Sequence, residues 1–157
     1  MATTLQNNTA DEYIAIDGEI KMNTTNRVPF NSTSVDFYYS PSGFSLTFYN
    51  NRNHQSEKSI RFAFKSDIKT GTYNIKEGAF VGATYFEHLN EINGGHPEDY
   101  EAVEGYLIIT ATGEGTPERS YHVTDFKLTV KSTFSGKKRE LEGNFKCRIE
   151  DVVKSPT

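Results

Sequence analysis

Hydrophobic and polar side chains alternate in several separate segments of the chain. Phe44, Leu46 and Phe48, for example, are separated by Ser45 and Thr47. Successive side chains of a strand point to opposite faces of a sheet, so each such segment is typical of a strand with one buried face. The clearest alternation predicts strands at Tyr13–Met22, Phe44–Tyr49, Ser59–Lys65 and Leu141–Ile149, and weaker patterns predict Val35–Ser40, Thr72–Ile75, Ala79–Phe86, Tyr100–Thr112 and Tyr121–Thr133.

Two of these segments contain further information about the sheet. In Tyr121–Thr133 the hydrophobic side chains change from odd to even positions, and a slip of one residue moves side chains to the opposite face. We therefore predict a β-bulge near Thr124–Asp125. Tyr106–Ile109 is hydrophobic at every position, which is typical of a central strand.

Turn-forming residues separate the segments, as at Pro41-Ser42-Gly43 and Ser135-Gly136-Lys137. The only candidate for a helix is short, at Tyr85–Asn90, and Gly94-Gly95 follows it. The sequence thus predicts an all-β fold, an antiparallel β-sandwich or closed β-barrel of about eight or nine strands. We expect a single domain over residues 1–157, with an ordered core of about 12–152 and frayed ends.

Composition narrows the classes of protein further. The chain has 157 residues, a net charge of -4 and one cysteine, Cys147, so it forms no internal disulfide. No hydrophobic run is long enough to span a membrane, and the acidic balance argues against nucleic acid as a partner. The first residues lack the features of a secretion signal, so we expect a cytoplasmic protein. Export without a classical leader, or after removal of a leader, is the alternative.

Three short segments carry a resemblance to known proteins. They are Gly71-Thr72-Tyr73, the strand from Gly105 to Thr110, and the closing strand from Leu141 to Phe145. Together they resemble small all-β bacterial domains of unknown function, many of which are lipoproteins with a β-sandwich fold. We expect the chain to differ from the lipoprotein members, since neither a leader nor a lipobox cysteine is recognised in the sequence. The resemblance implies an all-β, non-catalytic domain and supplies no catalytic residues.

The segment Glu87–Glu104 contains six acidic residues and two histidines but no lysine or arginine. Imidazole and carboxylate groups suit zinc and related divalent ions, and carboxylates alone suit calcium. The candidate metal ligands are His88, Glu91, His96 and Asp99. A solvated acidic loop with surface histidines is the simpler interpretation. We expect a mobile, unoccupied loop around residues 93–97, because acids without a basic partner repel one another. No cofactor is expected, although a divalent metal stays possible.

A basic surface is predicted near the end of the chain. Lys127 and Lys131 occupy the polar positions of one predicted strand, and Lys138, Lys146 and Arg148 those of the next. If these strands pair, the five side chains share one face. Such a face could bind phosphate, nucleic acid or an acidic protein surface, but exposed lysines also protect strands from unwanted pairing.

Catalysis has little support in the sequence, because none of the common nucleophile or phosphate-binding motifs is present. Cys147 shares the positions of Phe145 and Ile149, so we expect a buried and unreactive thiol. His54 and His122 have no evident partner.

The tyrosines suggest a function, because tyrosine combines a large contact area with a polar tip. The candidate ligand-binding residues, expected on outward or loop positions, are Tyr38, Tyr39, Tyr49, Tyr85 and Tyr100. Cross-strand pairing within the sheet is the competing explanation. The sequence therefore favours a non-catalytic binding module for a protein or a glycan. The alternatives are a calycin-like barrel that holds a small apolar ligand and a metal-dependent hydrolase built on Glu87–Glu104.

Overall fold

The structure is a computed structural model that describes residues 13–52, 56–88, 97–113 and 116–151. These residues form ten strands and no helix. The prediction of an all-β fold is confirmed. The strands are β1 (Tyr13–Thr24), β2 (Phe30–Ser32), β3 (Ser34–Ser40), β4 (Gly43–Asn50), β5 (Lys58–Lys65), β6 (Gly71–Asn74), β7 (Phe80–Glu87), β8 (Glu98–Thr112), β9 (Glu118–Ser132) and β10 (Lys138–Asp151).

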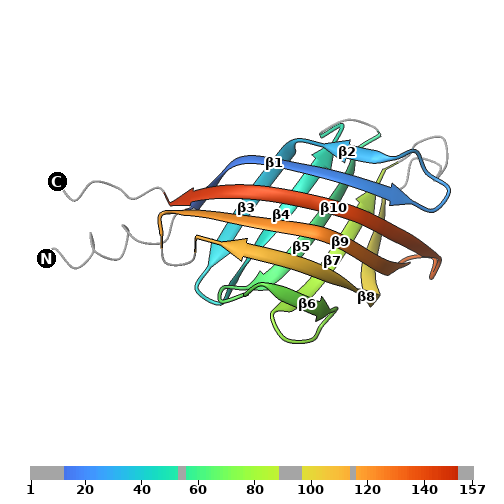
Figure 1. The fold of residues 1–157 in the computed structure, drawn as a ribbon. Helices are drawn as coiled ribbons and strands as arrows, with labels where there is room; N and C mark the ends of the chain where they lie inside the picture. Colours follow the sequence, from blue (N-terminus) through green and yellow to red (C-terminus); the bar gives the residue numbers. More distant parts are fainter. Residues whose placement is uncertain (1–12, 53–55, 89–96, 114–115, 152–157) are drawn as a thin grey trace, which may run out of the picture.

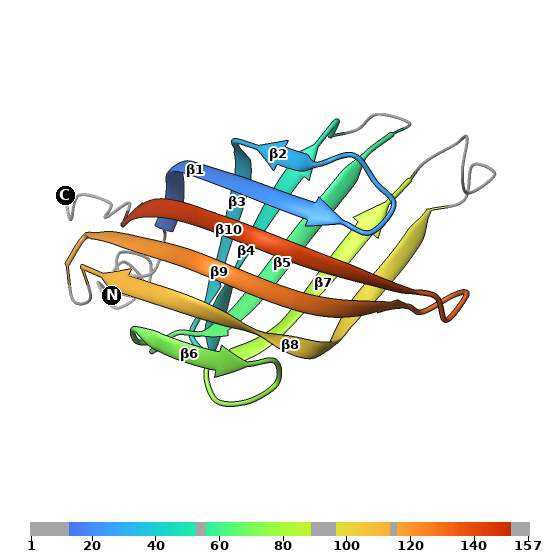
Figure 2. The ribbon, with the colours of Figure 1, turned by 45° about the vertical axis from the view of Figure 1, so that its right-hand side comes forward.

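All ten strands belong to one antiparallel sheet in the order β2-β1-β10-β9-β8-β7-β5-β4-β3, with β6 paired to β8. The sheet curls into a nearly closed barrel with two layers that cross each other (Figures 1 and 2). One layer contains β1, β10, β9 and most of β8, and the other contains β3, β4, β5 and β7. The start of β8 pairs with β7, so this strand joins the layers.

Bulges interrupt the regular pairing of two long strands, and a bulge bends the strand that contains it. In β9 the residues Thr124 and Asp125 lie opposite Asn144 alone, because Val123 pairs with Phe145 and Phe126 pairs with Gly143. The bulge predicted from the change of hydrophobic positions is therefore confirmed. A second irregularity lies in β8, between Ala102 and Glu104.

Aromatic rings fill the described part of the interior, and they connect the two layers. The Phe62 ring centroid lies 4.4 Å from that of Phe145 and 5.2 Å from that of Phe126. Near the starts of β4 and β9, the ring centroids of Phe44 and Tyr121 are 4.8 Å apart. These side chains are 4 % exposed or less. Hydrophobic burial between the layers is the main favourable contribution to folding.

Nine of the ten strands correspond to predicted segments, and the central position of Tyr106–Ile109 is confirmed, because β8 has partners on both sides. The sequence missed β2, which is only three residues long. The helix candidate is wrong for Tyr85–Glu87, which lie in β7, while residues 89 and 90 lie outside the described part. The predicted frayed ends, residues 1–11 and 153–157, lie outside the described residues. The described chain has no helix that could cross a membrane.

Candidate functional site

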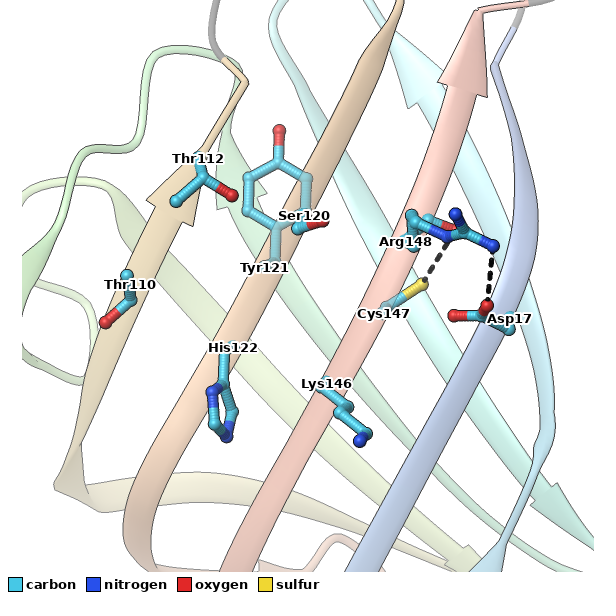
Figure 3. Close-up of a pocket in the computed structure, with 9 residues that line it drawn as sticks. All are labelled: Asp17, Thr110, Thr112, Ser120, Tyr121, His122, Lys146, Cys147 and Arg148. Carbon is cyan, nitrogen blue, oxygen red and sulfur yellow. Dashed lines mark hydrogen bonds and ion pairs between the residues drawn. The ribbon is translucent and has the colours of Figure 1, made fainter.

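Two rows of polar side chains cross the outer face of the layer formed by β8, β9, β10 and β1. Strand register places His122 between Thr110 and Lys146 in the first row. The second row runs through Thr112, Ser120, Arg148 and Asp17. We call these seven residues the polar concavity. They line a hollow of about 410 Å³ whose floor includes the strand segments at Tyr121 and Cys147 (Figure 3).

The short side chains of the concavity lie on β8 and at Ser120, and the long ones rise from β9 and β10. Arg148 is fixed in place, because it donates hydrogen bonds to Asp17 at 2.9 Å and to Glu118 at 3.1 Å. Both carboxylates also hold the pKa of Arg148 above its usual value. One edge of the concavity is thereby held in a defined geometry.

Lys146 and His122 form the other edge, side by side on neighbouring strands. Neither makes a hydrogen bond or ion pair with any other residue that the structure describes. An ammonium group donates only, whereas a neutral imidazole both donates and accepts. The hydroxyl groups of Thr110, Thr112 and Ser120 do the same. The concavity therefore offers donors and acceptors in close succession to a polar molecule.

Cys147 lies beneath this surface and takes no part in it. The side chain is 2 % exposed, and its one polar contact among the described residues is a 3.9 Å approach of Sγ to the Arg148 carbonyl oxygen. Burial, with a smaller effect of Asp17, raises the pKa of the thiol to about 12. The prediction of a buried core cysteine is confirmed by its exposure. Because the thiolate is the reactive form of cysteine, the raised pKa also disfavours reaction of this thiol.

The five predicted ligand-binding tyrosines do not come together. Tyr38 is 67 % exposed on the outer face of β3, and the ring of Tyr49 on β4 carries the Arg52 guanidinium at 4.0 Å. Tyr39 is half-buried and packs against the core. Tyr85 and Tyr100 are each 1 % exposed, so the expectation that they face outward is wrong.

The physical reason lies in a buried polar cluster at the end of the barrel where β1 and β7 end (Figure 2). Glu87, with 0 % exposure, accepts hydrogen bonds from the Tyr85 hydroxyl at 3.0 Å and from the Tyr100 hydroxyl at 3.3 Å. Arg27 donates to the same carboxylate through Nε at 3.0 Å and Nη2 at 2.8 Å. The two tyrosine rings extend the hydrophobic core, and their hydroxyl groups donate hydrogen bonds to the Glu87 carboxylate.

The charges of this cluster shift several pKa values. Burial alone would raise the pKa of Glu87, but the hydrogen bonds and charge of Arg27 outweigh it and hold the pKa below its usual value. Burial raises the pKa of Tyr85, and the nearby Glu87 charge adds to the effect. Glu87 therefore stays ionised inside the protein while the tyrosine stays protonated.

This pairing corrects the interpretation of Glu87–Glu104 as a solvated loop of unpaired acids. Glu87 is paired with an arginine 60 residues earlier, and Glu98 is 9 % exposed and accepts a hydrogen bond from Ser135. The expected strand end at Glu87 and re-entry near Tyr100 are confirmed.

Of the candidate metal ligands, His88 is half-buried and Asp99 is exposed, while Glu91 and His96 lie outside the described residues. The described residues contain no group of three metal-ligating side chains. His54 and the predicted loop at 93–97 fall largely outside that part as well.

The predicted basic face exists but is interrupted by acids. β9 and β10 pair as expected, with Lys131 opposite Lys138 and Lys146 opposite His122. However, Lys127 lies opposite Glu142, and Lys131 also lies opposite Glu101 on β8. The mixture of signs weakens any long-range attraction for an anion.

No family model, curated protein or solved structure matches the chain. The sequence pattern predicts that Lys146 and Arg148 face outward and gives no partner for His122, but it does not predict that the three residues lie together. The alternation of side chains indicates that these residues face outward. The register across β8, β9, β10 and β1 is what places them next to one another.

Proposed function

We propose that the protein is a non-catalytic binding module whose ligand is a neutral, hydroxyl-rich molecule such as a glycan, bound in the polar concavity. The observation that supports this proposal is the pair of cross-strand rows that gathers three hydroxyls, an imidazole and an ammonium around one hollow. The volume of about 410 Å³ lies within the range of sites for small molecules.

Charge balance favours a neutral ligand over an anionic one. The cations Lys146 and Arg148 are matched by Asp17 and Glu118, and Arg148 already binds both acids. A ligand with many hydroxyl groups would exchange its hydrogen bonds with water for hydrogen bonds with the Thr, Ser and His side chains. Such an exchange gives modest affinity and depends on geometry, which suits a surface site.

A binding role is preferred to a hydrolytic one because of how the side chains are connected. Ser120 and His122 are residue types of a nucleophile and a base, but no hydrogen bond joins them. Asp17, the nearby carboxylate, binds Arg148 and does not orient the imidazole. A nucleophile needs a base within reach that is itself held by a third group. The interior is not the preferred ligand site either, since aromatic rings occupy its described part.

The proposal is tested on an array of neutral and acidic glycans, followed by calorimetry with the best-bound glycan. We expect binding to neutral glycans and at least a tenfold loss of affinity in His122→Ala and Lys146→Ala, because each removes hydrogen bonds to the ligand. Lys127→Ala, an exposed lysine on the same face but outside the concavity, is the matched control and should change affinity less than twofold. Absence of any bound glycan, or equal affinity in all three variants, would refute the proposal.

A protein partner is the second candidate, and Tyr38 supports it. This ring is the most exposed tyrosine in the described chain, and nearby Arg52 is ordered by Tyr49 and by a 2.7 Å ion pair with Asp36. Exposed tyrosine and ordered arginine are typical of protein interfaces. A photo-crosslinking amino acid at position 38 should yield one discrete cross-linked product. The same amino acid at position 131, on the other layer, is the control, and equal products from both positions would exclude this interface.

A further inference from the structure

β7 and β8 lie side by side over only part of their length. Residues 84–87 of β7 pair with residues 98–101 of β8, and in the described chain no pairing joins the two strands beyond Thr84 and Glu101. β8 then bends into the other layer, where its later residues pair with β6 and β9 (Figure 2). The sheet therefore has a fork between β7 and β8.

A hollow of about 210 Å³ opens on the outer face of the sheet at this fork. Part of its lining consists of Ala63 and Gly82, which lie opposite each other on β5 and β7. Ala83 and Ala102 also line the hollow, although their positions in the strands are buried ones. The hollow therefore extends from the outer face into the gap between β7 and β8.

Gly82 leaves much of this space open. A Cβ at this position would meet no other atom within 4 Å, and the backbone of Gly82 lies outside the left-handed region. β7 has a bulge at Val81, since Gly82 pairs with Ala63 and Phe80 pairs with Phe64, but the bulge does not require a glycine at position 82. Glycine is unfavourable inside a strand and often marks a place where a ligand approaches the backbone.

Three of the described residues that line the hollow are charged, and two of them are paired with each other. Lys76 forms an ion pair of 3.6 Å with Glu101. Arg61 lies opposite Thr84 on β7 and Thr47 on β4, and it makes no hydrogen bond or ion pair with any residue that the structure describes. The lining thus has one excess positive charge. A guanidinium group binds a carboxylate through two parallel hydrogen bonds.

We propose that this hollow binds a small organic carboxylate, with its charged group on Arg61 and its hydrocarbon part over Gly82 and Ala63. The volume is below the usual range for drug-sized ligands, so the ligand is small. The apolar lining, which includes Val81, favours a compact hydrocarbon part, and an inorganic anion would leave that lining uncovered. The site lies on different strand segments from the polar concavity and does not depend on the proposed glycan binding.

An NMR titration of the full chain with sodium benzoate, at constant pH and ionic strength, tests the proposal. Benzyl alcohol has the same ring without the charge, and sodium phosphate has the charge without the ring. Benzoate should cause saturable shifts of the Gly82 and Ala63 amide signals, with an affinity at least about tenfold higher than that of either comparison ligand. The amide signal of His122, in the polar concavity, should not move, which separates this site from the glycan site.

Three variants locate the bound benzoate. Arg61→Met should weaken binding at least about tenfold, because it removes the charge-assisted hydrogen bonds. Lys65→Met removes an exposed cation from the same face of β5 outside the hollow, and it should change affinity less than about twofold. Gly82→Leu should abolish binding with little change in Tm, because its side chain enters open space. The proposal would be overturned by any of four results: no saturable shift at Gly82, equal affinity in Arg61→Met and Lys65→Met, undiminished binding by folded Gly82→Leu, or equal affinity for a comparison ligand.

Discussion

Removal of the buried arginine should be among the most damaging single substitutions in this protein. Arg27 and Glu87 have only 6 % and 0 % of their side-chain surfaces exposed, and two hydrogen bonds of 2.8 and 3.0 Å join them. Arg27→Met keeps most of the hydrophobic stem but removes the charge. Glu87 would then retain only the hydroxyls of Tyr85 and Tyr100 at 3.0 and 3.3 Å.

The magnitude follows from the loss of compensation for a buried carboxylate. Breaking a buried ion pair by removing one partner costs about 3–5 kcal/mol. Lys58 and Arg139 lie near enough to act on Glu87 and should offset part of this cost, so we expect about 3 kcal/mol. A domain of this kind has a total stability of roughly 5–15 kcal/mol. Arg27→Met should therefore lower the free energy of unfolding by a large fraction of its total.

The assay is equilibrium unfolding in urea at pH 7, monitored by circular dichroism. A double-mutant cycle with Glu87→Gln should give a coupling energy of at least about 2 kcal/mol, because the two groups contact directly. Arg52→Met is the matched control. Its ion pair with Asp36 is as short, at 2.7 Å, but the side chains are 46 % and 52 % exposed. Exposed pairs contribute about 0–1 kcal/mol. Equal costs for the two arginines would refute the argument from burial.

Three further predictions concern acid, glycine and thiol. The folded-state pKa of Glu87 lies below its unfolded value, so its stabilising contribution is present above about pH 5 and is lost as the pH falls through the folded-state pKa. The Tm of Glu87→Gln should therefore fall less than the Tm of the wild type between about pH 5 and 3. Gly143→Ala should cost about 1–3 kcal/mol, since its Cβ would overlap the Lys21 carbonyl oxygen, whereas Gly82→Ala meets no atom within 4 Å and should leave the Tm almost unchanged. Cys147 should react with a disulfide reagent at least about a hundredfold more slowly in the native protein than in urea, and rapid native labelling would contradict its burial.

The sequence predicted the strands well because alternation is a local property. Phe44, Leu46 and Phe48 face the core as expected, and the bulge at Thr124–Asp125 followed from the change of hydrophobic positions. The short strand β2 carries no such signal, because three residues are too few for a period of two to be recognised.

The candidate sites depend on contacts between distant parts of the chain. Glu87 was interpreted as a solvated acid because no basic residue lies near it in sequence, yet its partner is Arg27, in the turn after β1. Tyr85 and Tyr100 pair across β7 and β8 and face inward together. A local sequence pattern does not predict which tyrosine hydroxyl will donate a hydrogen bond to a buried carboxylate. That prediction requires the register between strands that are far apart in the sequence.

The pairing of β1 with β10 has a consequence for synthesis in the cell. These are the first and last strands in the order of the chain, and their ladder runs from Tyr13–Asp151 to Thr24–Leu141. Translation proceeds at about 5–20 residues per second, so β1 leaves the ribosome on the order of 10 s before its partner exists. During that interval β1 can pair only with β2, through three residue pairs. The sheet therefore cannot be completed until β10 has emerged. Until then the edge of β1 that pairs with β10 in the folded protein is unpaired and open to pairing with other strands.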